Sequence, residues 1–181
     1  MTFTRRITIA SLLVGAASFA VPGGPAHAEP ALVRPETVVV DPGLPATRVD
    51  ELTTAALRYD TFWATGDPEL ARAALDPAFV DRTLPPGRAQ GVAGPLAASV
   101  TMRAAMPDLS CTVEQLILAG DRAVAHLHFR GTFTGEFEGV HGTGQQVDFI
   151  ATDIYRVSRG RITDNWHIED NQTLMRQLGI A

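Results

Sequence analysis

The sequence predicts an α+β domain in which helices come first along the chain and a curved, mostly antiparallel sheet follows. Up to about residue 105, apolar residues recur every three or four positions, which is the helical period. After Asp108 the period changes to two, which is typical of strands with one buried face. Three helices can cover one face of such a sheet and leave a conical cavity between the two layers.

The first 28 residues are typical of an export signal. Arg5 and Arg6 precede an apolar run over 7–21, and small residues at 26–28 form a cleavage box. The run is shorter than the roughly 20 residues of a membrane-spanning helix. We expect cleavage with no stable membrane span afterwards, and an extracellular, periplasmic or cell-envelope location. Retention as an anchor is the alternative, and the twin-arginine and general secretory routes both stay open.

Residues 29–48 contain four prolines and show little amphipathic pattern. Proline at this density favours an extended linker over packed structure. The three valines at 38–40 leave an edge strand open as an alternative. We therefore expect the folded domain to span residues 49–181.

Three helices are expected, over residues 49–65, 67–75 and 95–105. In the first helix, Leu52, Ala56, Tyr59 and Trp63 form one apolar stripe. The second begins with Asp67 followed by a proline, the pattern of a helix cap and first turn.

Four strands are expected, over residues 111–118, 122–134, 146–157 and 161–170. Gly120 and Gly160 mark tight turns between them. The glycine-rich stretch 131–144 is expected to form a flexible surface loop that could cover the cavity as a lid.

Composition argues against several classes of function. The net charge is -5 without a basic tract, so no nucleic-acid partner is expected. A single cysteine, Cys111, excludes an intramolecular disulfide and a cysteine-based zinc site. His126, His128 and Arg130 share a strand face, but a third metal ligand would have to come from elsewhere, so a solvated face or a dimer interface is favoured. No metal and no cofactor is expected, and no phosphate loop or dinucleotide fingerprint is present.

Six short motifs follow one another along the chain. They are AFVDR at 78–82, PPG at 85–87, GTFTGEF at 131–137, TDIYR at 152–156, WHIED at 166–170 and QLG at 177–179. In this order they resemble the SnoaL-like polyketide (ester) cyclase family over about residues 50–181. The resemblance implies the nuclear transport factor 2-like fold, a cone with an internal ligand cavity that is usually dimeric through its sheet, so a homodimer is expected.

The resemblance also implies a reaction. Characterised relatives close a ring of an aromatic polyketide by intramolecular aldol condensation, without metal or cofactor. An aspartate near the end of the last strand is the acid/base group in that family, and Asp170 matches it best. The residue after Phe-Val-Asp is often histidine in the family, whereas here it is Arg82, which alters the charge of the pocket.

The strand pattern adds detail to the catalytic candidates Asp170, Asp153 and His167. Period two places Asp170 on the face of Trp166, where burial would tune its carboxyl group, and a helix cap is the alternative role. His167 lies on the opposite face and is a candidate proton shuttle or oxyanion donor. Asp153 interrupts an apolar row and is the second acid/base candidate, unless an arginine pairs with it.

The candidate substrate-binding residues are Tyr59, Trp63, Phe79, Arg82 and Trp166. The aromatic side chains are alternatively part of the core. Arg82 is expected either to steady an enolate or acidic substrate, or to pair with Asp81.

We therefore expect an exported protein that performs acid/base cyclisation or isomerisation of a hydrophobic carbonyl or polyketide-like small molecule. A non-catalytic module that binds a hydrophobic ligand is the first alternative. Epoxide hydrolysis is the second, and it needs Asp153, Asp170 and Arg82 to converge on a water. A cavity in which Asp170 is buried and unpaired would favour catalysis, whereas a cavity without titratable groups would favour binding.

Overall fold

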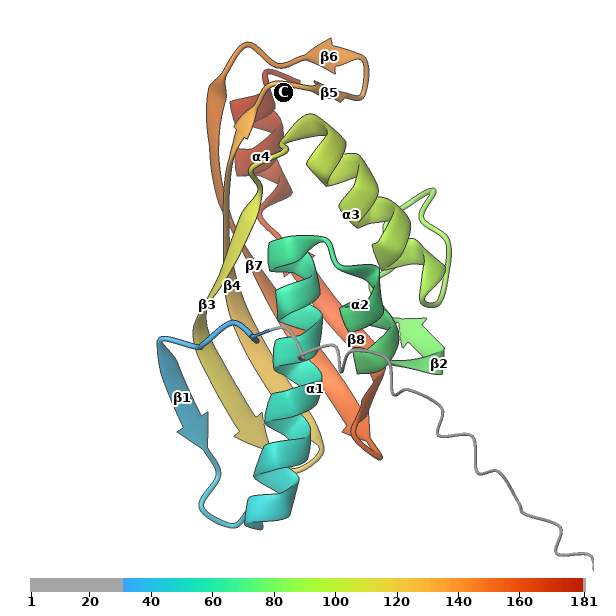
Figure 1. Ribbon diagram of the computed structural model, residues 1–181, viewed down its shortest axis with the longest axis vertical. Helices are drawn as coiled ribbons and strands as arrows, with labels where there is room; N and C mark the ends of the chain where they lie inside the picture. The colour runs from blue at the N-terminus through green and yellow to red at the C-terminus, as the bar shows by residue number, and fades with distance from the viewer. Residues whose placement is uncertain (1–30, 181) are drawn as a thin grey trace, which may run out of the picture. The chain divides into compact units, whose positions relative to one another are not determined.

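A curved six-stranded sheet with the order β1-β3-β4-β7-β8-β2 forms the frame of the fold. The computed structural model describes residues 31–180, and Figure 1 shows helices covering one face of the sheet. This arrangement confirms the α+β cone predicted from the sequence. The export signal predicted over 1–28 lies outside the described residues. Within residues 31–180, no helix combines the length and apolar character needed to cross a membrane.

Four long antiparallel strands form the centre of the sheet. They are β3 (Ser110–Ala119), β4 (Arg122–Phe133), β7 (Gln145–Ser158) and β8 (Arg161–Glu169). All four predicted strands are confirmed to within a residue at each end. Burial alternates along β7, so every second side chain points to the concave side.

The two edge strands run parallel to their neighbours. β1 (Thr37–Val40) pairs with β3, and β2 (Leu75–Asp81) pairs with β8. The linker predicted for 29–48 is therefore wrong for its described part, where Val33 N–H also donates to Thr61 Oγ1. The reason is that three β-branched valines favour extended backbone and can pair with the open edge of β3. β2 was not predicted.

The three predicted helices are confirmed, with shifted starts. They are α1 (Ala46–Thr65), α2 (Pro68–Ala74) and α3 (Ala93–Ala105). Gly66 ends α1 with φ at 79°, a conformation that favours glycine. The Asp67 carboxylate caps α2 by accepting from Glu69 N–H at 2.9 Å.

A fourth helix, α4 (Asn171–Leu178), follows the last strand, where the sequence had left a helix cap at Asp170 open only as an alternative. The Asp170 carboxylate accepts a hydrogen bond from Thr173 N–H, and Gly179 closes the helix with φ at 76°. Leu174 and Leu178 are buried, and the helix packs against β7. Local capping signals at both ends explain why this short segment is helical.

The glycine-rich stretch forms a hairpin, β5 (Glu136–Phe137) and β6 (Val140–His141), rather than an unstructured loop. Its base is secured to α3, because the N–H groups of Thr134 and Gly135 donate to Ala105 O. A Cβ atom at Gly135 would lie 2.0 Å from the carbonyl oxygen of Ala104. Only glycine permits this approach, so the hairpin has a fixed attachment.

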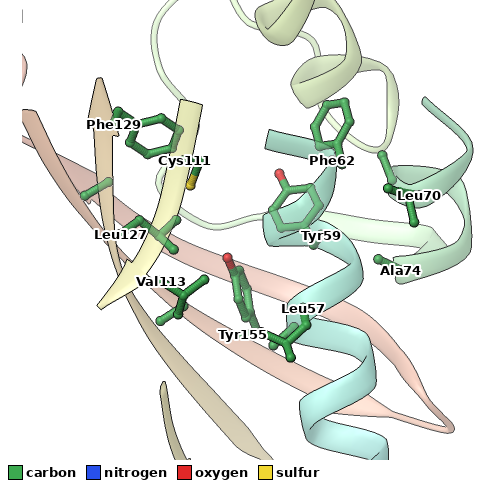
Figure 2. Close-up of a cluster of buried hydrophobic side chains, with 14 of the residues drawn as sticks. Leu57, Tyr59, Phe62, Leu70, Ala74, Cys111, Val113, Leu127, Phe129 and Tyr155 are labelled. Atoms are coloured by element: carbon green, nitrogen blue, oxygen red, sulfur yellow. The ribbon is translucent and has the colours of Figure 1, made fainter. Parts of the chain in front are cut away.

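The hydrophobic core lies between α1 and the sheet, as Figure 2 shows. Tyr59 packs edge to face on Tyr155 of β7, with ring centroids 5.7 Å apart. The Tyr155 hydroxyl donates to Asp60 Oδ1 at 2.7 Å, and burial raises the pKa of the Asp60 carboxyl group well above its usual range. These contacts hold α1 against β7 and position the helix over the cavity.

Candidate active site

A cavity of about 530 Å³ is lined by α1, α3, the concave face of the sheet and the loops at its open end. This volume is within the range of small-molecule sites. Its wall includes Tyr59, Trp63, Phe129 and Phe149. The rings of Phe129 and Phe149 are stacked with centroids 5.1 Å apart, and Trp63 meets Phe129 edge to face. The cavity therefore suits a hydrophobic molecule with flat groups.

Asp153 of β7 is a buried carboxyl group on this wall. Asn165 of β8 donates its side-chain N–H to Asp153 Oδ1. Burial raises the pKa of Asp153 to about 7, although the Asn165 hydrogen bond and the charge of His167 act in the opposite direction. The predicted alternative of an arginine partner is wrong, because the partner is an amide. Asp153 can therefore both accept and return a proton near neutral pH.

His167 lies on the same wall between two carboxylates. Its Nε2 is 3.0 Å from both oxygens of Asp81, and its Nδ1 is 2.7 Å from Glu169 Oε1. Burial opposes the charge, but these hydrogen bonds and the acidic charges raise the pKa of His167 to about 9. His167 is thus an imidazolium at neutral pH. Since both ring nitrogens are engaged, it is not arranged as the expected proton shuttle.

Tyr59 of α1 lines the cavity, and its ring meets that of Trp63 edge to face. Burial, followed by the charge of Asp153, raises the pKa of Tyr59 well above its usual range. The phenol therefore keeps its proton and is a hydrogen-bond donor for an oxygen inside the cavity. Of the five predicted substrate-binding residues, Tyr59 and Trp63 line the cavity.

Asp170 does not line the cavity. It caps α4, and the hydrogen bonds from Thr173 lower the pKa of its carboxyl group. The structure therefore corrects the expectation for Asp170 in favour of the capping role. The cause is the alternation along β8, which places residues 165, 167 and 169 on the concave side and leaves residue 170 at the start of the helix.

The other three predicted binding residues lie elsewhere. Phe79 is buried in the core, and Arg82 donates to Asp164, not to Asp81. Trp166 lies on the outer face of β8, where Arg122 and Arg156 stack over its ring. With Asp170 and Arg82 outside the cavity, the trio required for epoxide hydrolysis does not converge.

The outer face of β4 carries the two histidines that were considered as metal ligands. His126 bonds Thr152, and His128 bonds Glu114 and Asp148. Within the described part of the chain, no group of three or more His, Cys, Asp or Glu residues is arranged to hold a metal ion. These contacts are compatible with both expected roles of this face, a solvated face or a dimer interface.

No catalytic or substrate-binding role was predicted for four further residues that line the cavity, which are Asn165, Asp81, Glu169 and Arg88. Period two did place Asn165 and Glu169 on the face of His167. The contact of His167 with Asp81 depends on how β2 pairs with β8, because these two residues are 86 positions apart in the sequence. Arg88 is on the loop between β2 and α3, where no periodic pattern indicates to which side a side chain points.

The fold and the cavity define a protein of the nuclear transport factor 2-like class with an internal small-molecule site. The family model of SnoaL-like polyketide cyclases matches residues 53–178. The chain therefore belongs to the SnoaL-like polyketide cyclase family. Family membership supports a cyclase or isomerase kind of function. A separate comparison with curated proteins gave no match.

Three solved structures illustrate the likeness. A candidate polyketide cyclase from Bacillus cereus is 38% identical, with a TM-score of 0.75 over 82% of this chain and 94% of that chain. TsrD from Streptomyces laurentii is 28% identical, with a TM-score of 0.64 over 76% and 99% of the two chains. IdmH, a candidate polyketide cyclase from Streptomyces antibioticus, is 29% identical, with a TM-score of 0.62 over 73% and 98%.

Proposed function

We propose that the protein is a cofactor-independent cyclase or isomerase, with Asp153 as the acid/base group and a hydrophobic carbonyl compound of the polyketide type as substrate. The observation that carries the proposal is the buried Asp153 carboxyl group on an apolar cavity wall, with its pKa raised to about 7. A titratable group in such a place favours catalysis over simple ligand binding. In this proposal Asp153 has the role that the family resemblance suggested for Asp170.

The reaction consists of two proton transfers and one bond formation. Asp153 takes a proton from the carbon beside a carbonyl group, and the C–H electron pair moves to the carbonyl oxygen as an enolate. The enolate carbon then attacks a second carbonyl carbon of the same molecule, so that a C–C bond forms and an alkoxide develops. Asp153 returns its proton to the alkoxide. The product is an isomer of the substrate, and no other reactant is needed.

Burial of Asp153 makes this proton abstraction easier. The carboxyl pKa rises from 3.8 to about 7. Each unit of pKa shift corresponds to about 1.4 kcal/mol. The carboxylate is therefore a stronger base by on the order of 4 kcal/mol. The cost is a less stable fold, since the ionised group is held away from water.

Two neighbours support the negative charge that develops on oxygen. Tyr59 supplies a hydroxyl donor from α1, and His167 supplies a fixed positive charge from β8. Such groups lower the barrier when they are oriented before the reaction begins. Asn165 supports the charged form of Asp153 through its hydrogen bond.

The proposal can be tested by measuring the turnover of a model substrate. The wild-type chain and Asp153→Asn are incubated with an aromatic β-keto ester that carries a pendant carbonyl group, and ring closure is followed by chromatography. We expect conversion by the wild type and a loss of at least about 100-fold in the variant, the usual contribution of an acid/base group. Folded wild-type protein that binds the ester without converting it would favour the binding module instead.

We further propose that the protein is a homodimer through the outer face of the sheet. Ile150, Ile154 and Ile168 are exposed on β7 and β8, and Ile168 has 76% of its surface accessible. Neighbouring exposed apolar side chains of this size favour an interface. Light scattering after size exclusion is expected to give a dimer mass that Ile168→Glu reduces, whereas a wild-type monomer at all concentrations would contradict the proposal.

Export is proposed from the sequence of the first 28 residues. Their pattern supports a cleaved signal, which would place the mature start at Glu29. Mass spectrometry of the protein outside the cytoplasmic membrane is expected to show this new N-terminus. Recovery of only the uncleaved chain with the cell contents would contradict it.

A further inference from the structure

Arg88 is the second cationic group on the wall of the cavity, after His167. It lies half-buried on the loop between β2 and α3. Among the described residues, its guanidinium group makes no hydrogen bond and no ion pair. A guanidinium has five N–H donors, and partial burial without an acceptor is costly. The missing acceptor therefore has to come from water or from a ligand.

The loop that carries Arg88 is closed by specific contacts. The Gln90 side chain accepts from Asp81 N–H at 2.7 Å and donates to Asp81 O at 2.9 Å. Arg88 N–H donates to Pro85 O, which closes a turn within the loop. The two Gln90 bonds tie the loop to Asp81 at the end of β2, and Asp81 also holds His167.

The stem of Arg88 is also fixed in place. A Cβ atom at Gly94, at the start of α3, would lie 3.2 Å from Arg88 Cγ and 2.2 Å from the carbonyl oxygen of Ala89. Glycine at this position therefore leaves room for the loop and for the aliphatic part of Arg88. The side chain is held against the helix, so less conformational freedom is lost when its guanidinium binds an acceptor.

The remaining charges of the wall leave Arg88 available. Asp81 and Glu169 are both bonded to His167. Asp153 is uncharged in a large share of molecules near neutral pH, since its pKa is about 7. Glu138 lies exposed on the hairpin between β5 and β6. The field of Arg88 does reach the inner wall, because it contributes to lowering the pKa of Glu169 and opposes the rise at Tyr59.

From this arrangement we infer that Arg88 binds a carboxylate group of the substrate, so that a ligand with a free carboxylate binds more tightly than the corresponding ester, which the cavity also accepts. A planar carboxylate matches the paired N–H donors of a guanidinium. A single guanidinium with Glu138 and Glu169 on the same wall favours a monoanion over a phosphate dianion. The inference rests on the proposed function, and it names the substrate class of the same cavity.

The position of Arg88 also gives the substrate a direction. Arg88 is half-exposed, whereas Asp153 is buried on β7. A substrate with its carboxylate on Arg88 therefore extends its apolar part inward along the aromatic wall. The carbon that loses its proton then lies at the inner end, away from the carboxylate. This separation keeps the two negative charges, on the substrate and on Asp153, apart.

Calorimetric titration of the full chain with a matched pair of ligands tests the inference. The probes are 1-hydroxy-2-naphthoate and its methyl ester, which have the same ring system and differ in charge. We expect the wild type to bind the acid more tightly than the ester. In Arg88→Gln, affinity for the acid is expected to fall about 10- to 100-fold, as for loss of a charged bidentate contact, with the ester within about twofold.

Arg159→Gln is the matched control, because Arg159 is exposed on the turn between β7 and β8 and does not line the cavity. It is expected to bind both probes like the wild type. Equal loss of acid and ester in Arg88→Gln would overturn the inference, since that pattern indicates a structural role for the loop. Wild-type protein that binds the ester as tightly as the acid, or that binds neither, would also overturn it.

The titration, together with the turnover assay described above, separates this inference from the proposed function. Asp153→Asn is expected to keep the preference for the acid while losing turnover. If Asp153→Asn retains full turnover but Arg88→Gln loses the preference, the proposed chemistry fails and the carboxylate site stands. If turnover depends on Asp153 but the acid is not preferred, the chemistry stands and the carboxylate site fails.

Discussion

Asp153 and His167 face each other as a directly opposed pair on β7 and β8. In an antiparallel ladder such a pair brings the two Cβ atoms to within about 4.5–5.5 Å. One member is a carboxyl group with its pKa near 7, and the other is an imidazolium with its pKa near 9. Because Asp81 and Glu169 engage both ring nitrogens of His167, the histidine acts on Asp153 through its charge.

The dependence of kcat/KM on pH is expected to be bell-shaped. Asp153 must be ionised to accept a proton, so kcat/KM rises as the pH increases through about 7. Above about 9, His167 loses its positive charge and the rate falls. A pH–rate profile checks both limbs. A rising limb near 3.8, the ordinary value for aspartate, would contradict the assignment of Asp153 as the base.

Substitution of Asn165 by leucine is expected to move the rising limb to higher pH. The Asn165 N–H stabilises the charged form of Asp153, so its removal makes ionisation harder. Asn171→Leu is the control, since Asn171 lines the cavity without a hydrogen bond to Asp153. The pH–rate profiles of the two variants are compared. A common shift, or no shift in either, would indicate that the amide does not set the basicity of Asp153.

Removal of the Tyr59 hydroxyl is expected to lower kcat about 10- to 100-fold with little change in KM, because the donor acts on charge that develops during the reaction. Tyr155→Phe is the matched variant. It loses the hydrogen bond to Asp60 in the core and is expected to reduce stability rather than kcat. Steady-state kinetics and thermal melting of both variants measure the contrast. Similar kcat values for Tyr59→Phe and the wild type would exclude this role.

Asp153→Asn is expected to stabilise the fold at neutral pH. The folded pKa of about 7 exceeds the unfolded value of 3.8, so wild-type stability is lost as the pH rises between these values. The loss amounts to about 1.4 kcal/mol per pH unit. The difference in unfolding free energy between variant and wild type should therefore grow from about pH 4 to about pH 7 and then stay constant. Urea denaturation across this range would refute the idea if the difference did not change with pH.

The sequence was sufficient for the class of fold because its signals are local. Period two and the glycine turns located β4, β7 and β8, and the same alternation put Asp153 on the concave side. The residues that set the chemistry were harder to identify. The contact of Asp81 with His167 needs the long-range pairing of β2 with β8, and a periodic pattern carries no information about that register.

Asp170 shows why a motif alone did not distinguish an acid/base group from a helix cap. Its position after the last strand was consistent with both an acid/base group and a helix cap. The decisive feature was the turn into α4, where Thr173 N–H binds its carboxylate. A short helix of eight residues gave a weak signal in the sequence, so the cap was not recognised as the stronger interpretation.

Proton exchange in deuterated water tests the central claim most directly. A β-keto ester without a pendant carbonyl cannot cyclise, so the exchange of its acidic C–H, followed by proton NMR, reports on the base alone. Asp153→Asn is compared with Asp170→Asn, which preserves the cap because asparagine caps helices about as well as aspartate. We expect the wild type and Asp170→Asn, but not Asp153→Asn, to accelerate exchange above the rate measured without protein. Loss of exchange in Asp170→Asn with exchange retained in Asp153→Asn would contradict the account.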